Sequence, residues 1–145
     1  MARTTFSGPV ASTNGFIGNI AGSGSITHGT TAAINATATA TAAEVATGWI
    51  TSTSAAATTI TLPTGTLLGA ALGAVKGTVF DLYIDNTGGV NTVTIAAATN
   101  GVVSTAGVDT AGSFGDLTVA SGATGLARFT LMFSSATAYA FTRTA

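Results

Sequence analysis

The sequence predicts an all-β protein: an antiparallel β-sandwich or jelly-roll-like domain with one short helix and an extended N-terminal arm. Only 6% of the residues are charged, 46% are hydrophobic and the mean hydropathy is +0.56, which excludes a disordered chain. Threonine, serine and glycine are abundant, and β-branched threonine favours extended backbone. Roughly seven or eight short strands, with turn signals about every 8 to 12 residues, are typical of sandwiches.

The chain of 145 residues fits one domain. We predict an extended arm at residues 1–33 and a single β-sandwich domain at residues 34–145. The arm is rich in Gly, Ser and Thr and has too little periodicity to form its own core. Two alternatives stay open: a mobile tail or edge strand, or an arm that docks on a neighbouring subunit. In the second case its contact residues are the isolated apolar side chains Phe6, Val10, Phe16, Ile17 and Ile20.

The first part of the domain consists of small and β-branched residues. The Thr-Ala alternation within residues 33–43 suits close sheet packing, and Glu44 begins a short turn or helical step. Residues 48–53 and 58–62 are predicted strands, and Pro63 ends the second.

A short helix is predicted at residues 67–75, with a hydroxyl N-cap in the preceding Thr64-Gly65-Thr66. Its apolar face is formed by Leu67, Leu68, Ala71, Leu72 and Val75. Gly69 and Gly73 weaken a helix by about 1 kcal/mol each relative to Ala, so packing must hold this helix over the end of the sheet.

Residues 77–97 have the clearest two-residue alternation. Phe80, Leu82 and Ile84 share one face of a strand, whereas Asp81 and Asp85 lie on the other. Residues 86–89, Asn-Thr-Gly-Gly, tolerate positive φ, and residues 92–95 alternate again. This pattern predicts a β-hairpin.

The C-terminal part contains three further predicted strands. Residues 102–115 look irregular, and strands follow at residues 117–119, 126–133 and 138–143. The strand at 126–133 is almost apolar on both sides. One of its faces is formed by Ala127, Phe129, Leu131 and Phe133, and the other by Leu126, Arg128, Thr130 and Met132.

Composition also restricts the partners. The four basic residues are scattered, so a nucleic-acid surface is disfavoured. No apolar run could span a bilayer, and the N-terminus lacks the pattern of a signal peptide, so we expect synthesis in a cytoplasm, no secretion and no membrane partner. A net charge of −1 gives little repulsion between copies, which favours self-association.

The residue types that carry chemistry are sparse, and we predict no enzyme, catalytic residue, cofactor or metal. His28 is the only histidine, and cysteine is absent. Asp81 and Asp85 are expected to be solubilising charges on an edge or rim; a hard-cation site shared with Asp109 or Asp116 is the alternative. Trp49, Tyr83 and Tyr139 could line a sugar-binding platform, although core or interface packing is favoured.

Residues 36–97 resemble a module of structural proteins from tailed bacteriophages, especially marine and cyanobacterial ones. The shared features are a Thr-Ala strand, Gly-aromatic-Ile-Thr-Ser-Thr at residues 48–53, Thr-Leu-Pro-Thr at 61–64 and the Asn-Thr-Gly and Asn-Thr-Val-Thr segments within 86–94. Residues 6–18 are similar to the starts of small virion proteins of such phages.

This resemblance implies a capsid decoration (cement) protein, commonly trimeric, that binds the outer surface of the head and bridges neighbouring major capsid proteins. The expected location is the capsid surface of the virion, and the arm residues above would then contact the capsid or another subunit. The alternative is a head or tail fibre module that contacts host surface glycans.

Overall fold

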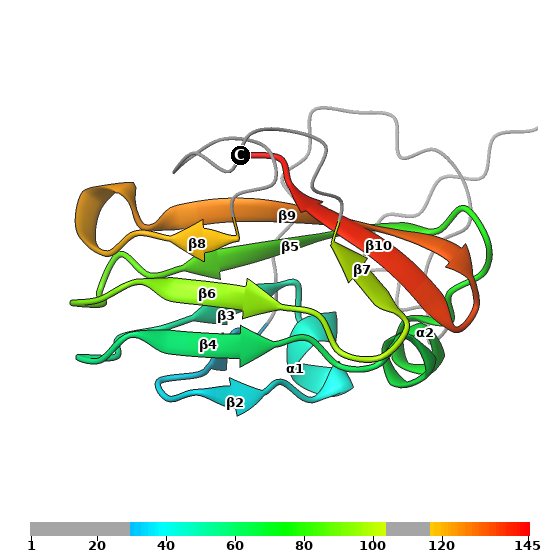
Figure 1. Cartoon of the computed structure of the whole chain (residues 1–145), viewed down its shortest axis with the longest axis horizontal. Helices are drawn as coiled ribbons and strands as arrows, with labels where there is room; N and C mark the ends of the chain where they lie inside the picture. Colours follow the sequence, from blue (N-terminus) through cyan, green and yellow to red (C-terminus); the bar gives the residue numbers. More distant parts are fainter. Residues whose placement is uncertain (1–29, 104–116) are drawn as a thin grey trace, which may run out of the picture.

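The computed structural model describes residues 30–103 and 117–145, which form mostly strands (Figure 1). In chain order the elements are β1 (Ala32–Ala33), β2 (Ala38–Thr39), α1 (Ala42–Ala46), β3 (Trp49–Thr51), β4 (Thr58–Thr61), α2 (Gly65–Leu72), β5 (Val79–Asp85), β6 (Val93–Ala96), β7 (Gly101–Val103), β8 (Thr118–Val119), the 3₁₀ turn η1 (Gly122–Thr124), β9 (Leu126–Ser135) and β10 (Ala138–Arg143).

The strands form two mixed sheets. Sheet A has the order β1-β3-β5-β9-β10-β7, and sheet B has the order β2-β4-β6-β8. Pairing is antiparallel where β9 meets β5 and β10 and where β6 meets β8, and parallel at the other contacts. The prediction of a strand-rich, two-sheet protein is confirmed, but the sheets are not purely antiparallel. Two α-helices are present where the sequence predicted one helix and, at Glu44, only a turn or helical step.

The first six strands alternate between the two sheets. β1, β3 and β5 belong to sheet A, whereas β2, β4 and β6 lie side by side in sheet B (Figure 1). Each coil of the chain therefore consists of a strand in sheet A, a β-arch that crosses to sheet B, a strand there and a return path. Successive coils stack in parallel, with Ala32 beside Ile50 and Ile50 beside Ile84 in sheet A.

The predicted hairpin at residues 77–97 is wrong. β5 and β6 are consecutive in sequence but lie in different sheets, so residues 86–92 form a β-arch. Asn86 explains the difference, because its side chain is buried and its Nδ2 donates to the backbone oxygens of Asn91, Val119 and Ala120. These bonds direct the chain inward and across to sheet B.

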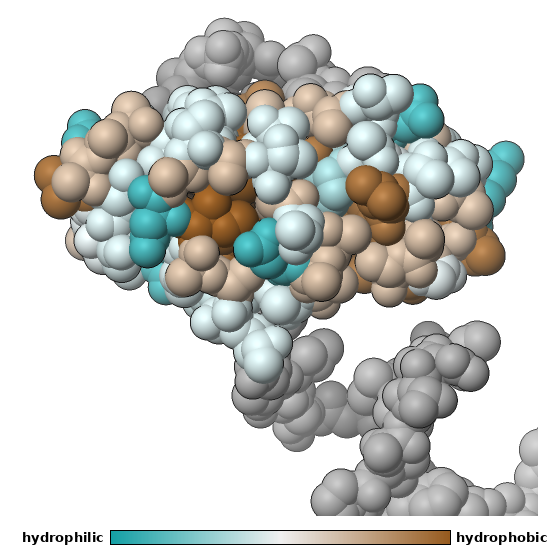
Figure 2. Space-filling model, turned by 90° about the horizontal axis from the view of Figure 1, so that it is seen from below, coloured by the Kyte–Doolittle hydropathy of each residue, from teal (hydrophilic) through white to brown (hydrophobic). Residues whose placement is uncertain are grey.

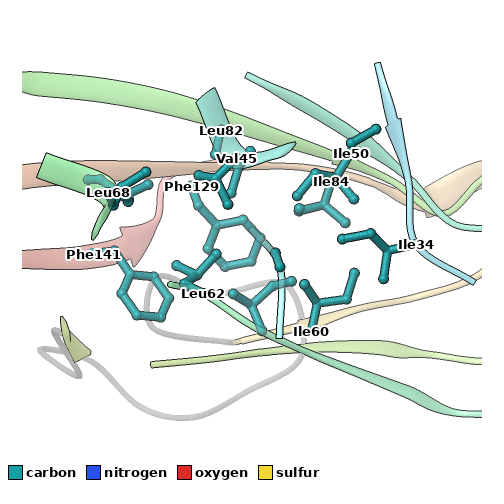
Figure 3. Packing of buried hydrophobic residues seen from close by; sticks show 14 of the residues in the cluster. Ile34, Val45, Ile50, Ile60, Leu62, Leu68, Leu82, Ile84, Phe129 and Phe141 are labelled. Carbon is teal, nitrogen blue, oxygen red and sulfur yellow. The ribbon is translucent and has the colours of Figure 1, made fainter. Parts of the chain in front are cut away.

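The core lies between the two sheets. Ile50, Leu82 and Ile84 of sheet A and Ile60 of sheet B are fully buried, and their side chains point into the same space (Figure 3). The alternation predicted for β9 is confirmed, since the four residues that share one predicted face, Ala127, Phe129, Leu131 and Phe133, are all buried; Tyr139 and Phe141 of β10 are buried as well.

The return paths of the first two coils contain the helices. Thr41 and Glu44 form a capping box at the start of α1, in which the Thr41 N–H and Oγ1 both donate to Glu44 Oε2. These hydrogen bonds hold the pKa of Glu44 below its usual value. Thr64 caps α2 as predicted, because its Oγ1 accepts from the Leu67 N–H.

The predicted buried face of α2 is wrong in part. Leu68 is buried and Leu72 packs on the core, but Leu67 and Val75 are 60% and 64% exposed. Gly65 and Gly69 lie on the buried face instead, because the backbone of the turn between β9 and β10 packs directly against them.

The two-sheet fold also begins slightly earlier than the predicted domain boundary. Ala32 and Ala33, assigned to the arm at residues 1–33, pair with Ile50 and Thr51 of β3. The arm up to residue 29 lies outside the described residues.

Candidate interaction surfaces

Several predicted site residues lie outside the described ranges. They include all five predicted contact residues of the arm: Phe6, Val10, Phe16, Ile17 and Ile20. His28, Asp109 and Asp116 also lie there. The candidate surfaces below are therefore built from the two sheets and α2.

The outer face of sheet A has an aromatic pair at its centre. Trp49 of β3 and Tyr83 of β5 are register partners, and their rings stack at a centroid distance of 5.3 Å with 19° between their planes. Arg128 of β9 is the register partner of Tyr83 on its other side, and its Nε donates to Thr144 Oγ1 at 3.1 Å. These three residues place two aromatic rings and a guanidinium side by side on one half-exposed surface, which we call the aromatic row.

Tyr139 is not part of this aromatic surface. Its side chain is 1% exposed in the core, and its hydroxyl donates to the Pro63 oxygen at 2.9 Å. Burial raises the pKa of Tyr139 to about 12. Of the three aromatic residues considered for a sugar platform, only Trp49 and Tyr83 come together.

The two aspartates of β5 also lie on the outer face of sheet A, but not on an edge. β5 lies between β3 and β9, so of the two predicted positions, an edge or a rim, the sheet edge is wrong. Asp81 Oδ1 accepts from Thr130 Oγ1 at 2.6 Å, and Asp85 Oδ1 accepts from Thr87 Oγ1 at 2.6 Å. Within residues 30–103 and 117–145, no three His, Asp or Glu side chains gather into a possible metal site.

An exposed apolar surface lies at the end of the molecule that contains α2. Val79 and Met132 are cross-strand neighbours on the outer face of sheet A and are 61% and 50% exposed. Val75 lies one turn before Val79, since its oxygen accepts from the Thr78 N–H, and Leu67 of α2 is also exposed. We call these four residues, Leu67, Val75, Val79 and Met132, the apolar end surface.

Sequence reasoning missed this surface because it assigned Leu67 and Val75 to a buried helix face. One signal was present: the strand containing Met132 is nearly apolar on both sides, although only one side can face the core. An apolar residue on the second side then points to a contact outside the domain.

A hollow of about 360 Å³ lies where the first coil ends both sheets. Among the residues that the structure describes, β1 and β2 are edge strands of sheets A and B, and the hollow between them is lined by residues that include Ala33, Ile34, Asn35, Ala38, Thr39 and Glu44. Figure 2 looks at this end from below and shows apolar residues near the middle, with hydrophilic residues beside them, on a mostly pale surface.

Charged groups of the described residues are mostly engaged in hydrogen bonds within the domain. Besides Asp81, Asp85, Glu44 and Arg128, Arg143 donates from Nη1 to the Thr118 oxygen at 2.7 Å. What these surfaces present to a partner is therefore chiefly hydroxyl and apolar groups. In the described ranges, no helix has the length and apolar character needed to cross a membrane.

Comparisons with protein-family models, with curated proteins and with solved structures find no match for this chain. The interpretation of its function therefore depends on its own residues and surfaces.

Proposed function

We propose that this chain is a structural virion protein of a tailed bacteriophage, a capsid decoration protein that binds the outer surface of the head. It bridges neighbouring major capsid proteins as a homotrimer and stabilises the shell. It is made in the host cytoplasm, resides on the capsid surface, and has no catalytic activity, nucleic-acid partner or membrane partner. The sequence resemblance described above supports this proposal.

The observation that carries the proposal is the apolar end surface on a domain with few charges. Four large apolar side chains at this end are half exposed or more, and two of them, Val79 and Met132, are cross-strand neighbours; exposed apolar groups of this kind are typical of sites that another protein covers. Burial of apolar area contributes roughly 25 cal/mol per Å², an upper value once the costs of association are included. On a shell that binds many copies, the modest stabilisation from each contact adds up.

The predicted contacts of the arm belong to the same proposal. Phe6, Val10, Phe16, Ile17 and Ile20 are large apolar residues in a segment otherwise rich in Gly, Ser and Thr, a pattern that suits an extended segment on a neighbouring subunit. The arm and the apolar end surface would then provide two separate attachments to the shell.

The experiment is co-sedimentation of the purified chain with heads that lack it. We expect saturable binding by the wild type and a loss of at least about tenfold in affinity for Val79→Asp and Met132→Asp, since each places a charge in an apolar contact. Val90→Asp is the matched control because Val90 is 69% exposed in the arch between β5 and β6, outside the apolar end surface. Equal binding by all three variants would contradict the proposal.

The aromatic pair on sheet A supports a second candidate, a head or tail fibre module that contacts host surface glycans. Trp49 and Tyr83 provide stacked rings, and Arg128 provides a charged donor in the same row. Glycan-array binding that is lost in Trp49→Ala, together with absence of the protein from heads, would favour this function over decoration.

A further inference from the structure

A chain of hydrogen bonds joins a guanidinium to a carboxylate on the outer face of sheet A. Arg128 Nε donates to Thr144 Oγ1 at 3.1 Å, and Thr144 Oγ1 lies 3.1 Å from Thr130 Oγ1. Thr130 Oγ1 in turn donates to Asp81 Oδ1 at 2.6 Å. Because a hydroxyl has a single hydrogen, the Thr144 hydroxyl donates to Thr130, with a longer contact of 3.3 Å to the Arg128 oxygen. The bonds therefore run in one direction, from Arg128 to Asp81.

This chain of bonds uses one side of each charged group. Within residues 30–103 and 117–145, the Arg128 side chain forms its hydrogen bond through Nε and the Asp81 side chain through Oδ1. The two Nη groups of Arg128 and Oδ2 of Asp81 are therefore left for a ligand. Both residues are partly exposed, so a ligand can reach them while water screens their charges less than on an open surface.

The two charged groups are neighbours on the sheet. Arg128 is the register partner of Tyr83, and Asp81 is the register partner of Thr130. Arg128 and Asp81 therefore occupy diagonal positions on one face, where Cβ atoms are roughly 7–8 Å apart. One monosaccharide can span such a separation. The stacked rings of Tyr83 and Trp49 belong to the same surface.

We infer that this surface binds an acidic sugar through Arg128 and Asp81. The sugar carboxylate accepts from the two Nη groups of Arg128, and a hydroxyl of the same sugar donates to Asp81 Oδ2. A guanidinium whose Nε is held by a threonine presents its two Nη groups as a fork, which matches the two oxygens of a carboxylate.

The position of Asp81 favours a sugar over the acidic side chain of a partner protein. An Asp or Glu side chain would bring a second negative charge close to Asp81 and carries no donor of its own for Oδ2. An acidic sugar carries hydroxyl groups on the same ring as its carboxylate, so one residue satisfies both Arg128 and Asp81. Its C–H groups suit a surface that contains aromatic rings.

The inference goes beyond attachment to a shell, and it deepens the second candidate function because it names the class of glycan. Titration of the full chain with tetragalacturonate, in the absence of heads, tests it. Trp49 is the only tryptophan, so its fluorescence reports binding beside Arg128. We expect tetragalacturonate to bind at least about tenfold more tightly than its methyl ester, which lacks the charged carboxylates.

Variants of the basic residues show which cation binds the carboxylate. Arg128→Gln should weaken the binding of tetragalacturonate at least about tenfold, and Arg128→Lys, which keeps the charge and loses the fork, should also weaken it. Lys76→Gln is the matched control, because it removes one positive charge from an exposed position outside the aromatic row. Wild-type affinity in Arg128→Gln, or equal affinity of the wild type for the acid and the ester, would overturn the inference.

Asp81→Asn separates a sugar from a protein carboxylate. The amide keeps an oxygen for Thr130 but places a donor where Oδ2 accepted, so this variant should bind tetragalacturonate more weakly. It should bind acetate more tightly, because a negative charge near Arg128 is removed. Tighter binding of both ligands would mean that the site takes a plain carboxylate from a protein, and would overturn the inference. Head binding by Val79→Asp tests the decoration function independently of this result.

Discussion

Single side chains decide how this chain crosses between its sheets. Asn86 is buried at the end of β5, and its amide joins the following arch to the end of β8. Its backbone N–H also donates to the Gly125 oxygen at 2.6 Å, which ties the arch to the start of β9. One residue therefore connects its own arch to two places more than thirty residues later, the end of β8 and the start of β9.

Asn86→Asp should destabilise the protein in a pH-dependent way. The new carboxyl would face three backbone oxygens without the amide donor, so its pKa would rise above the ordinary value of about 3.9. A raised acid pKa means that stability falls as pH rises above about 4. Urea unfolding at pH 4 and pH 7 should therefore show a gap between wild type and variant that widens with pH.

Asn35→Asp is the matched control, because Asn35 Oδ1 accepts from the Thr53 N–H and a carboxylate can accept the same bond. Its stability should stay close to wild type at both pH values. A similar pH-dependent loss of stability in both variants would show that the burial of Asn86 is not the cause of that loss.

Tyr139 gives a second test at the residue scale. Tyr139→Phe removes the hydrogen bond to the Pro63 oxygen, which costs about 1–3 kcal/mol when a buried acceptor is left unpaired. Because burial raises the pKa of Tyr139 to about 12, the wild type should lose stability as pH rises from about 10 toward 12. The phenylalanine variant should lack this loss, so the two stability curves should converge in alkali; curves that stay parallel would contradict the account.

At the scale of elements, each helix connects a strand of sheet B to the next strand of sheet A and packs on the core. α2 lies against the turn between β9 and β10 through Gly65 and Gly69, where an added Cβ would overlap the oxygens of Thr137 and Ala136. The glycines that weaken the helix in isolation are therefore required for close packing in the fold.

The substitution Gly69→Ala separates helix propensity from close packing, because the two effects change the free energy of unfolding in opposite directions. Helix propensity alone predicts stabilisation by about 1 kcal/mol, whereas the overlap with the Ala136 oxygen predicts a loss of about 2 kcal/mol or more. Ala71→Gly, at an exposed position of the same helix, is the control and should cost about 1 kcal/mol. Chemical denaturation measures both, and a more stable Gly69→Ala variant would refute the packing argument.

The sequence predicted elements well where one face of a strand is buried. Phe129, Leu131 and Phe133 alternate with Arg128, Thr130 and Met132, and this two-residue period identified β9 and the residues that share its buried face. The sheet to which each strand belongs was not predictable in the same way. A hairpin turn and a β-arch both use Asn and Gly, and only the burial of Asn86 among distant backbone oxygens separates them.

The surfaces were predictable only in part for a related reason. A helical pattern shows which residues can share a face, but Leu67 and Leu68 are adjacent, and the period cannot say which of them meets the core. The position of the turn at Ala136, more than sixty residues later, decides it. Such long-range contacts leave no pattern in the nearby sequence from which they could be predicted.

At the scale of the whole molecule, the two sheets enclose one core, and the described residues offer two surfaces to partners: the apolar end surface and the aromatic row on sheet A. Few charges project from them, so contact with other copies and with a shell carries little desolvation cost for ions. We propose that the apolar end surface lies against a capsid.

A density map of an intact phage particle that contains this chain would test the proposed capsid contact most directly. The account predicts trimers of this fold on the outside of the head, at junctions between major capsid proteins, with Val79 and Met132 in contact with the shell. A map that shows this fold only in the tail or its fibres, with bare junctions on the head, would contradict it.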